Sequence, residues 1–197
     1  MSSDVDGLIR ADFDEHAAVL ARCKPVVPHA LQNAVNLSIK CLDAGNRVFA
    51  MGNGGSAAQV HHFVSELVGR FERDRPPLAA VSLVSDAATI TSLANDDGFT
   101  EVFSRQVRAL AVPGDVVVAF STSGTSPNVV AAMNTAAELG CATIALTGES
   151  GGDLADIVDV LVPIPSTSVA RIQEMHLVAV HSWCARLDEW AEQAIDG

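Results

Sequence analysis

The sequence is short of the features that mark several classes of protein. Its 197 residues hold 12 Lys and Arg against 24 Asp and Glu, a net charge of -12. No Lys/Arg cluster is available to neutralise phosphates, so neither a nucleic-acid nor an anionic-membrane partner is expected. No apolar run approaches the roughly 18 residues that a membrane span needs. The acidic N-terminus lacks the basic-then-apolar pattern of a signal peptide.

Cysteine is scarce as well, and the four cysteines are widely spaced without a CxxC pair: Cys23, Cys41, Cys141 and Cys184. This spacing argues against disulfide staples and against a zinc finger. Buried thiols in a reducing compartment are the simpler interpretation. We therefore expect a cytoplasmic protein.

What the sequence does have is apolar residues, 49% of the total, in short continuous runs. These runs alternate with helical patterns, which predicts an α/β fold: a three-layer, doubly wound parallel sheet with helices on both faces. We expect one domain over 1–197, with an extra N-terminal helical hairpin at 1–45 and the α/β core and C-terminal helix at 46–197. The expected strands are Val48–Met51, Leu78–Leu83, Val116–Phe120, Ala142–Thr147 and Val158–Ile164.

A glycine turn follows the first expected strand and leads into a helix that opens at Ser56. It contains Gly52, Asn53, Gly54 and Gly55. Backbone N–H groups at such a turn, backed by the positive end of a helix, form an anion site. The turn also fits the G-x-G-x-x-[GA] dinucleotide pattern. That alternative is disfavoured, because no acidic residue stands at the end of the second strand about 20 residues on.

A second polar loop follows the strand that ends at Phe120. It places five hydroxyl groups in six residues: Ser121, Thr122, Ser123, Thr125 and Ser126. A helix then starts at Pro127. Hydroxyl donors beside a helix start match the oxygens of a phosphate group, although an ordinary polar turn with a capping serine is the alternative. Both loops follow carboxyl ends of parallel strands, where ligands bind in such sheets.

Two helices carry side chains suited to proton transfer or metal binding. His62 and Glu66 are four residues apart and share a helix face. A solvated surface pair is the alternative for them. In the last helix, Gln173 and His181 interrupt an apolar stripe. They stand about 12 Å apart along the axis and converge on one ligand only if both side chains reach inward.

Taken together, five motifs resemble the phosphoheptose isomerase family of the SIS (sugar isomerase) domain superfamily. They are GNGGS, HFxxEL from His62 to Leu67, the Asn95-Asp96 turn, STSGxS and RIQExHxxxxH. The resemblance implies a five-stranded, flavodoxin-like sheet in a homotetramer with active sites near the subunit interfaces. It also implies isomerisation of sedoheptulose 7-phosphate, a ketose, to the aldose glycero-manno-heptose 7-phosphate through an enediol(ate).

The resemblance assigns a role to each candidate residue. Glu66 is the general base and His181 the acid/base partner. Zinc is the implied cofactor, with the ligands His62, Glu66, Gln173 and His181. The implied substrate contacts, beyond Glu66 and Gln173, are Asn53, Gly54, Gly55, Ser56, Asn95, Asp96, Ser121, Thr122, Ser123 and Ser126.

Three positions depart from the family pattern. Ala170 stands where some members have an Asp that contacts the sugar, Thr125 replaces Asn, and Ser65 replaces Glu. The sequence also resembles non-catalytic relatives that bind the bacterial replication initiator, which leaves a phosphosugar-binding or scaffold protein as the alternative. That branch lacks the equivalents of Glu66 and His181, so their presence here favours an enzyme.

Overall fold

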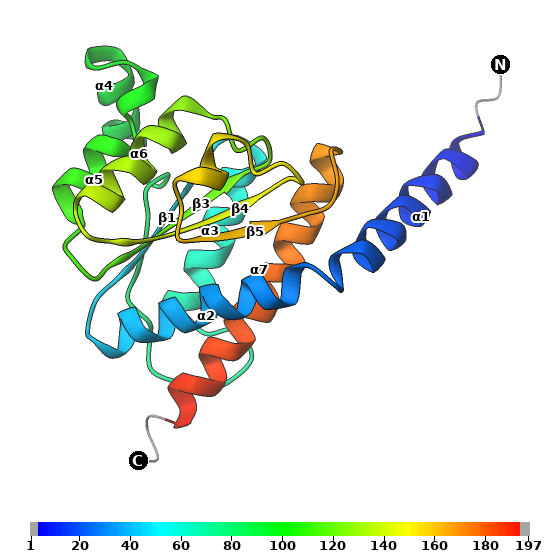
Figure 1. The fold of residues 1–197 in the computed structure, drawn as a ribbon, viewed down its shortest axis with the longest axis horizontal. Helices are drawn as coiled ribbons and strands as arrows, with labels where there is room; N and C mark the ends of the chain where they lie inside the picture. The colour runs from blue at the N-terminus through cyan, green and yellow to red at the C-terminus, as the bar shows by residue number, and fades with distance from the viewer. Residues whose placement is uncertain (1–3, 194–197) are drawn as a thin grey trace.

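The computed structural model describes residues 4–193, which form a five-stranded parallel sheet between two layers of helices (Figure 1). The strand order is β2-β1-β3-β4-β5. The strands are β1 (Val48–Gly52), β2 (Ala80–Ser82), β3 (Val116–Ser121), β4 (Ala142–Thr147) and β5 (Val160–Pro163). The predicted fold class is therefore confirmed. Pro163 lies in the edge strand β5, where its missing N–H leaves no gap between paired strands.

Helices cover both faces of this sheet. One layer holds α2 (Val27–Asp43), α3 (Gly55–Val68) and α7 (Val169–Gln193). The other holds α5 (Ser104–Leu110) and α6 (Pro127–Glu138), with α4 (Ala87–Asp96) and the short 3-10 helices η1 (Phe99–Glu101) and η2 (Gly152–Asp156) nearby. Within residues 4–193, no helix is both apolar and long enough to cross a membrane.

Alternation along the strands builds a separate core on each face. In β1, Val48 and Ala50 pack under α2, α3 and α7, whereas Phe49 and Met51 pack under α5 and α6. All four side chains are buried. A strand covered on both faces needs apolar residues at every position, which explains the continuous apolar runs in the sequence.

The first helix, α1 (Val5–Cys23), leads away from the body of the molecule and does not lie along α2 (Figure 1). Its middle part is tied to α7. His16 Nδ1 lies 2.7 Å from Glu174 Oε2, and Arg171 donates to the backbone oxygen of Asp12 at 2.6 Å. The two helices expected in 1–45 are thus present, but they extend the molecule more than a hairpin would.

Two expected boundaries differ from the structure. Strand β2 is three residues long, shorter than the expected Leu78–Leu83. Asn95 and Asp96, expected in a turn, instead form the end of α4. The Asp86 side chain caps the start of α4 by accepting from the N–H groups of Ala88 and Thr89. The helix runs on through Asn95 and Asp96 because the glycine with a positive φ, Gly98 at 90°, comes after them.

Candidate active site

The glycine loop and the serine loop lie side by side because β1 and β3 are neighbours in the sheet. Gly52, at the end of β1, pairs with Phe120 of β3. A Cβ atom at Gly52 would lie 2.8 Å from the Phe120 carbonyl oxygen, so only glycine allows this close approach. The chain turns in opposite directions after these two strands, to β2 and to β4. This is the switch point at which doubly wound sheets bind ligands.

The glycine loop turns sharply into α3. Gly54 has φ 55° and ψ -122°, a conformation that residues with a side chain rarely adopt. The N–H of Ser56 donates to the Asn53 oxygen at 3.0 Å as the helix begins. The turn thus precedes the N-terminus of a 14-residue helix, where backbone donors and the helix dipole favour an anion.

The serine loop is held in shape by its own hydroxyl groups. Ser121 Oγ accepts from the N–H of Gly124 at 3.2 Å, and Ser123 Oγ accepts from the N–H of Thr125 at 3.2 Å. Gly124 has φ 70°, and a Cβ there would lie 2.0 Å from the Gly151 oxygen. Ser126 stands at the N-cap of α6. The predicted phosphate-binding residues of both loops are therefore grouped at one edge of the sheet.

A pair of amide side chains joins the two loops. Asn53 Nδ2 donates to Asn128 Oδ1 at 2.9 Å, and Asn128 Nδ2 donates to Asn53 Oδ1 at 3.0 Å. Asn128 Oδ1 also accepts from the N–H of Val129. Asn128 is buried. The sequence gives no signal for Asn128, because a polar residue after Pro127 is ordinary in the first turn of a helix.

Helices α3 and α7 bring the two predicted catalytic residues, Glu66 and His181, into contact with the predicted metal ligand His62. His62 Nε2 lies 3.2 Å from Glu66 Oε1 on α3 and 3.1 Å from His181 Nε2 on α7. The centroid of the His181 ring lies 5.1 Å from that of His62 and 5.2 Å from that of Phe71. Glu66 and His62 are half-buried. His181 also borders a groove of about 1050 Å³ between α2 and α7.

Gln173 is not part of this three-residue contact in the described chain. Its amide lies against the glycine loop, so close that a Cβ at Gly55 would lie 2.6 Å from Nε2. The backbone oxygen of Gln173 accepts from Gln59 on α3. Eight residues separate Gln173 from His181, about 12 Å along the helix axis, which explains why one chain does not bring the two side chains together.

Asn95 and Asp96 lie apart from the two loops, exposed at the end of α4. Their recorded side-chain contact is with each other: Asn95 Nδ2 donates to Asp96 Oδ1 at 2.7 Å. Their sugar-binding role stays a prediction from the resemblance.

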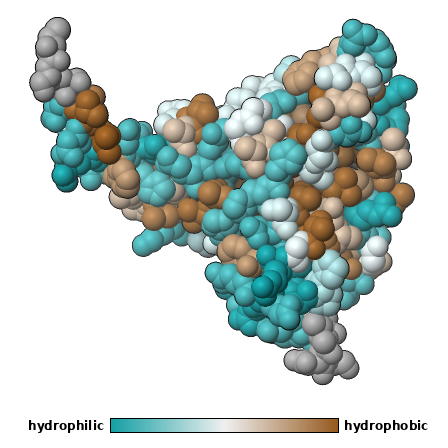
Figure 2. Space-filling view, turned by 180° about the vertical axis from the view of Figure 1, so that it is seen from behind, coloured by the Kyte–Doolittle hydropathy of each residue, from teal (hydrophilic) through white to brown (hydrophobic). Residues whose placement is uncertain are grey.

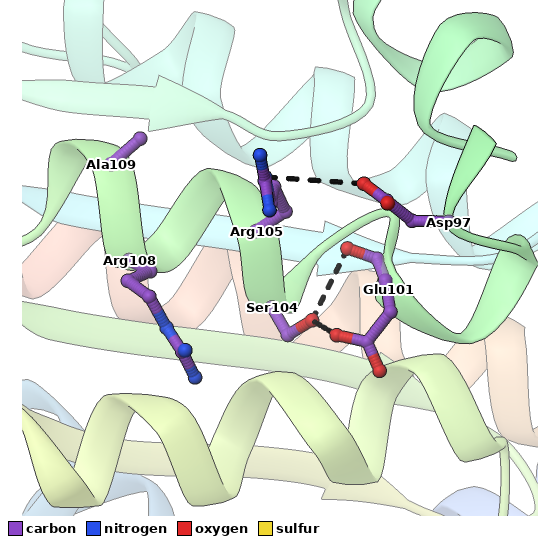
Figure 3. A pocket seen from close by; sticks show the side chains of 6 residues that line it. All are labelled: Asp97, Glu101, Ser104, Arg105, Arg108 and Ala109. Carbon is purple, nitrogen blue, oxygen red and sulfur yellow. Dashed lines mark hydrogen bonds and ion pairs between the residues drawn. The ribbon is translucent and has the colours of Figure 1, made fainter.

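A smaller hollow of about 370 Å³ lies beside α5 (Figure 3). Two of its charged groups have partners: Glu101 accepts from Ser104, and Arg105 lies 4.0 Å from Asp97. The residues lining it are Asp97, Glu101, Ser104, Arg105, Arg108 and Ala109. None of them is a predicted site residue, and the hollow is no part of the candidate site.

Comparison with known proteins agrees with this geometry. A family model described as "SIS domain" matches residues 13–148. A phosphoheptose isomerase of Shewanella sediminis is 46% identical over 183 residues, which are 91% of this chain and 93% of that protein. One of Alteromonas mediterranea is 43% identical over 184 residues, 92% of this chain and 93% of that protein.

Solved structures give the same result. The structure of phosphoheptose isomerase from Neisseria gonorrhoeae has a TM-score of 0.90 and 39% identity, and covers 94% of this chain and 99% of its own. That of a phosphoheptose isomerase from Francisella tularensis has a TM-score of 0.91 and 36% identity, and covers 95% of this chain and 99% of its own.

Proposed function

The chain belongs to the SIS domain family and is a sugar phosphate isomerase of the phosphoheptose isomerase type, and we propose that it converts sedoheptulose 7-phosphate to glycero-manno-heptose 7-phosphate. One observation carries the proposal: Glu66 and His181, from two different helices, meet around His62 on the helix that starts at the glycine loop. An anion site and an acid–base pair are the parts that a phosphosugar isomerase needs.

The phosphate group binds to the two loops at the switch point. Its oxygens accept hydrogen bonds from the hydroxyls of the serine loop and from backbone N–H groups of the glycine loop. The chain has a net charge of -12, so these local donors hold the anion without help from the overall charge. Binding at this remote group contributes energy that orients the reacting carbons.

The reaction moves one proton between adjacent carbons. The Glu66 carboxylate takes a proton from C1 of the ketose and returns it to C2, with an enediolate between the two steps. The His181 imidazole gives a proton to the oxygen on C2 and takes one from the oxygen on C1. Each group ends the cycle as it began, so no external acid or oxidant is consumed.

Zinc fits part of the predicted ligand set. Two nitrogen ligands of a tetrahedral zinc ion stand about 3.3 Å apart, and the two Nε2 atoms of His62 and His181 are 3.1 Å apart. Among residues 4–193, no group of three or more His, Cys, Asp and Glu is arranged around a metal position. His62 and His181 would hold the ion as they stand. To complete the predicted set, Glu66 would have to move onto the ion and Gln173 would have to turn away from Gly55.

Bound zinc would polarise the substrate carbonyl and stabilise negative charge on the enediolate. Metal analysis of the purified protein tests its presence. We expect one equivalent of zinc per chain in the wild type and much less bound zinc in His62→Gln. A protein that takes up no zinc and is fully active without it would contradict this part of the proposal.

Association into a homotetramer is also proposed. The projecting α1 exposes an apolar stripe (Figure 2) that comprises Val5, Leu8, Ile9 and Phe13. Phe13 is 74% exposed, an unusual state for so large an apolar side chain. Another subunit that covered this stripe would remove it from water.

Glu66→Gln tests the chemistry directly. The amide has the shape of the carboxylate but cannot take the proton, so turnover should fall at least about 100-fold while the substrate still binds. NMR detection of the aldose and calorimetric titration of substrate measure the two effects. His61→Gln, at an exposed position of the same helix, is the control variant and should stay active.

Two results would separate the parts of the proposal. An active Glu66→Gln variant would remove Glu66 as the base. A wild-type protein that gives no aldose from the heptulose phosphate, but isomerises another phosphosugar, would overturn the substrate alone.

A further inference from the structure

A fully buried ion pair lies beyond the end of α3, outside the residues assigned to the reaction. Arg75 Nε donates to Asp188 Oδ1 of α7 at 2.7 Å, and both side chains are 0% exposed. A buried ion pair often stabilises a protein no more than apolar residues of the same volume would. The groups that the Arg75–Asp188 pair orients are therefore a better guide to its role than its contribution to stability.

The rest of the Arg75 guanidinium binds the carboxyl-terminal end of α3. It donates to the backbone oxygens of Glu66 at 2.7 Å, Leu67 at 2.9 Å and Gly69 at 3.2 Å. It also donates to Pro76 O at 2.9 Å. The last carbonyl groups of a helix have no partner within the helix. Arg75 therefore fixes the end of α3 at the residue that carries the proposed base.

Asp188 fixes the loop that follows. Its second oxygen accepts from the N–H groups of Glu72 at 2.8 Å and Arg73 at 2.9 Å. Burial raises the pKa of Asp188, but these N–H groups and the Arg75 guanidinium outweigh burial and leave the pKa below its usual value. The carboxylate is therefore ionised at neutral pH and can accept all three bonds.

The residue just before this bonded segment contacts the site. Phe71 stacks on the His181 imidazole with 24° between the ring planes and 5.2 Å between centroids. His62 approaches the same imidazole at its Nε2 atom, 3.1 Å away. The loop thus forms one wall around the ring that the mechanism uses to move protons between oxygens.

We propose that Arg75 and Asp188 are positioning residues that hold the loop of residues 69–76. The loop places Phe71 so that it fixes the His181 ring against His62. The same clamp holds the end of α3, which carries Glu66. The inference rests on the proposed isomerase function. The phosphate-binding loops lie at the opposite end of α3, so loss of the clamp should lower kcat and leave KM nearly unchanged.

Two substitutions test this without leaving a buried charge unpaired. Arg75→Lys keeps a cation for Asp188 but cannot reach four carbonyl oxygens at once. Phe71→Leu leaves the clamp intact and removes the ring stacked on His181. Each should lower kcat about 10- to 100-fold, the size of loss that small misplacements of reacting groups cause, with KM within about threefold of wild type.

Two control variants separate positioning from general stability. Glu192→Gln breaks an exposed ion pair between α7 and Arg73 of the same loop and should leave kcat unchanged. Met133→Ala opens a cavity in the core on the other face of the sheet. It should lower the melting temperature and keep kcat at 25 °C. An equal fall of kcat in Met133→Ala, at a matched melting temperature, would overturn the inference.

A readout independent of turnover keeps this inference distinct from the proposed function. The ring protons of His181 feel the ring current of Phe71, so their NMR signals, assigned by their loss in His181→Gln, should shift in Phe71→Leu. Arg75→Lys should shift the same signals in the same direction. If the His181 signals do not move in Arg75→Lys, the inference is overturned, whichever sugar the enzyme acts on. A wild-type protein without isomerase activity would instead count against the proposed function alone.

Discussion

His176 should make the stability of the fold depend on pH between neutrality and pH 4. The ring is fully buried and lies edge-on to Phe120 at 6.1 Å. Its Nε2–H donates to the Thr147 oxygen at 3.2 Å, and Nδ1 is buried without a partner among the described residues. Burial, only partly offset by the Thr147 hydrogen bond, lowers the pKa of His176 from 6.5 to about 4.

The sign follows from which state binds the proton. Below pH 6.5 the unfolded chain protonates this histidine, whereas the folded protein does not until about pH 4. The stability present above pH 6.5 is therefore lost as the pH falls. The loss from this group amounts to about 2 kcal/mol between pH 7 and pH 5, and about 3 kcal/mol once the pH is well below 4.

Urea unfolding of wild type and His176→Gln measures this contribution. Fluorescence of the buried Trp183 reports unfolding, at one fixed protein concentration because subunit association also stabilises. The loss of unfolding free energy from pH 7 to pH 5 should be about 2 kcal/mol smaller in the variant. His29→Gln, at an exposed position, should behave as wild type. Equal losses in wild type and His176→Gln would refute the reasoning.

Two further predictions concern the loops and the assembly. Asn128→Leu leaves Asn53 without its two amide hydrogen bonds, so KM for the heptulose phosphate should rise about 10- to 100-fold with a smaller change in kcat. In the same steady-state assay, Asn128→Asp keeps one acceptor and should raise KM less. A normal KM in Asn128→Leu would show that the amide pair does not shape the phosphate site. Wild type should have the mass of a tetramer in light scattering, and Leu8→Asp combined with Phe13→Asp should give smaller species; an unchanged mass would exclude the α1 stripe from the interface.

Much of the fold follows from local patterns. Continuous apolar runs predict buried parallel strands because a strand covered on both faces buries every one of its side chains. The order of strands and loops then places the glycine and serine turns at one edge, since parallel strands end at the same edge. The prediction for Asn95 and Asp96 is wrong because Asn-Asp-Asp-Gly resembles a turn, whereas the helix continues up to Asp96 and the chain changes direction only at Gly98, which has φ 90°.

Contacts that depend on distant partners could not be predicted in this way. Nothing in RFERDR distinguishes Arg75 from Arg70 or Arg73, yet Arg75 is buried against Asp188, 113 residues further along the chain. Gln173 was expected beside His181 from the family pattern, whereas the packing of α7 along α3 places it against Gly55. Sequence patterns therefore predict residues with a chemical role more readily than the residues that position them.

The packing of α7 along α3 also explains why binding and chemistry should respond separately to substitution. Three contacts join the two helices. Gln59 contacts Gln173 near the start of α3, and His62 contacts His181 in its middle. Beyond the end of α3, Arg75 contacts Asp188. The first contact adjoins the phosphate loops and the last adjoins Phe71. A change at the first level acts on the group that anchors the substrate and so on KM. In the proposed mechanism, a change at the last level would alter the angle at which His181 meets the sugar. It should therefore act on kcat, because the proposed phosphate anchor at the far end of α3 would still be in place.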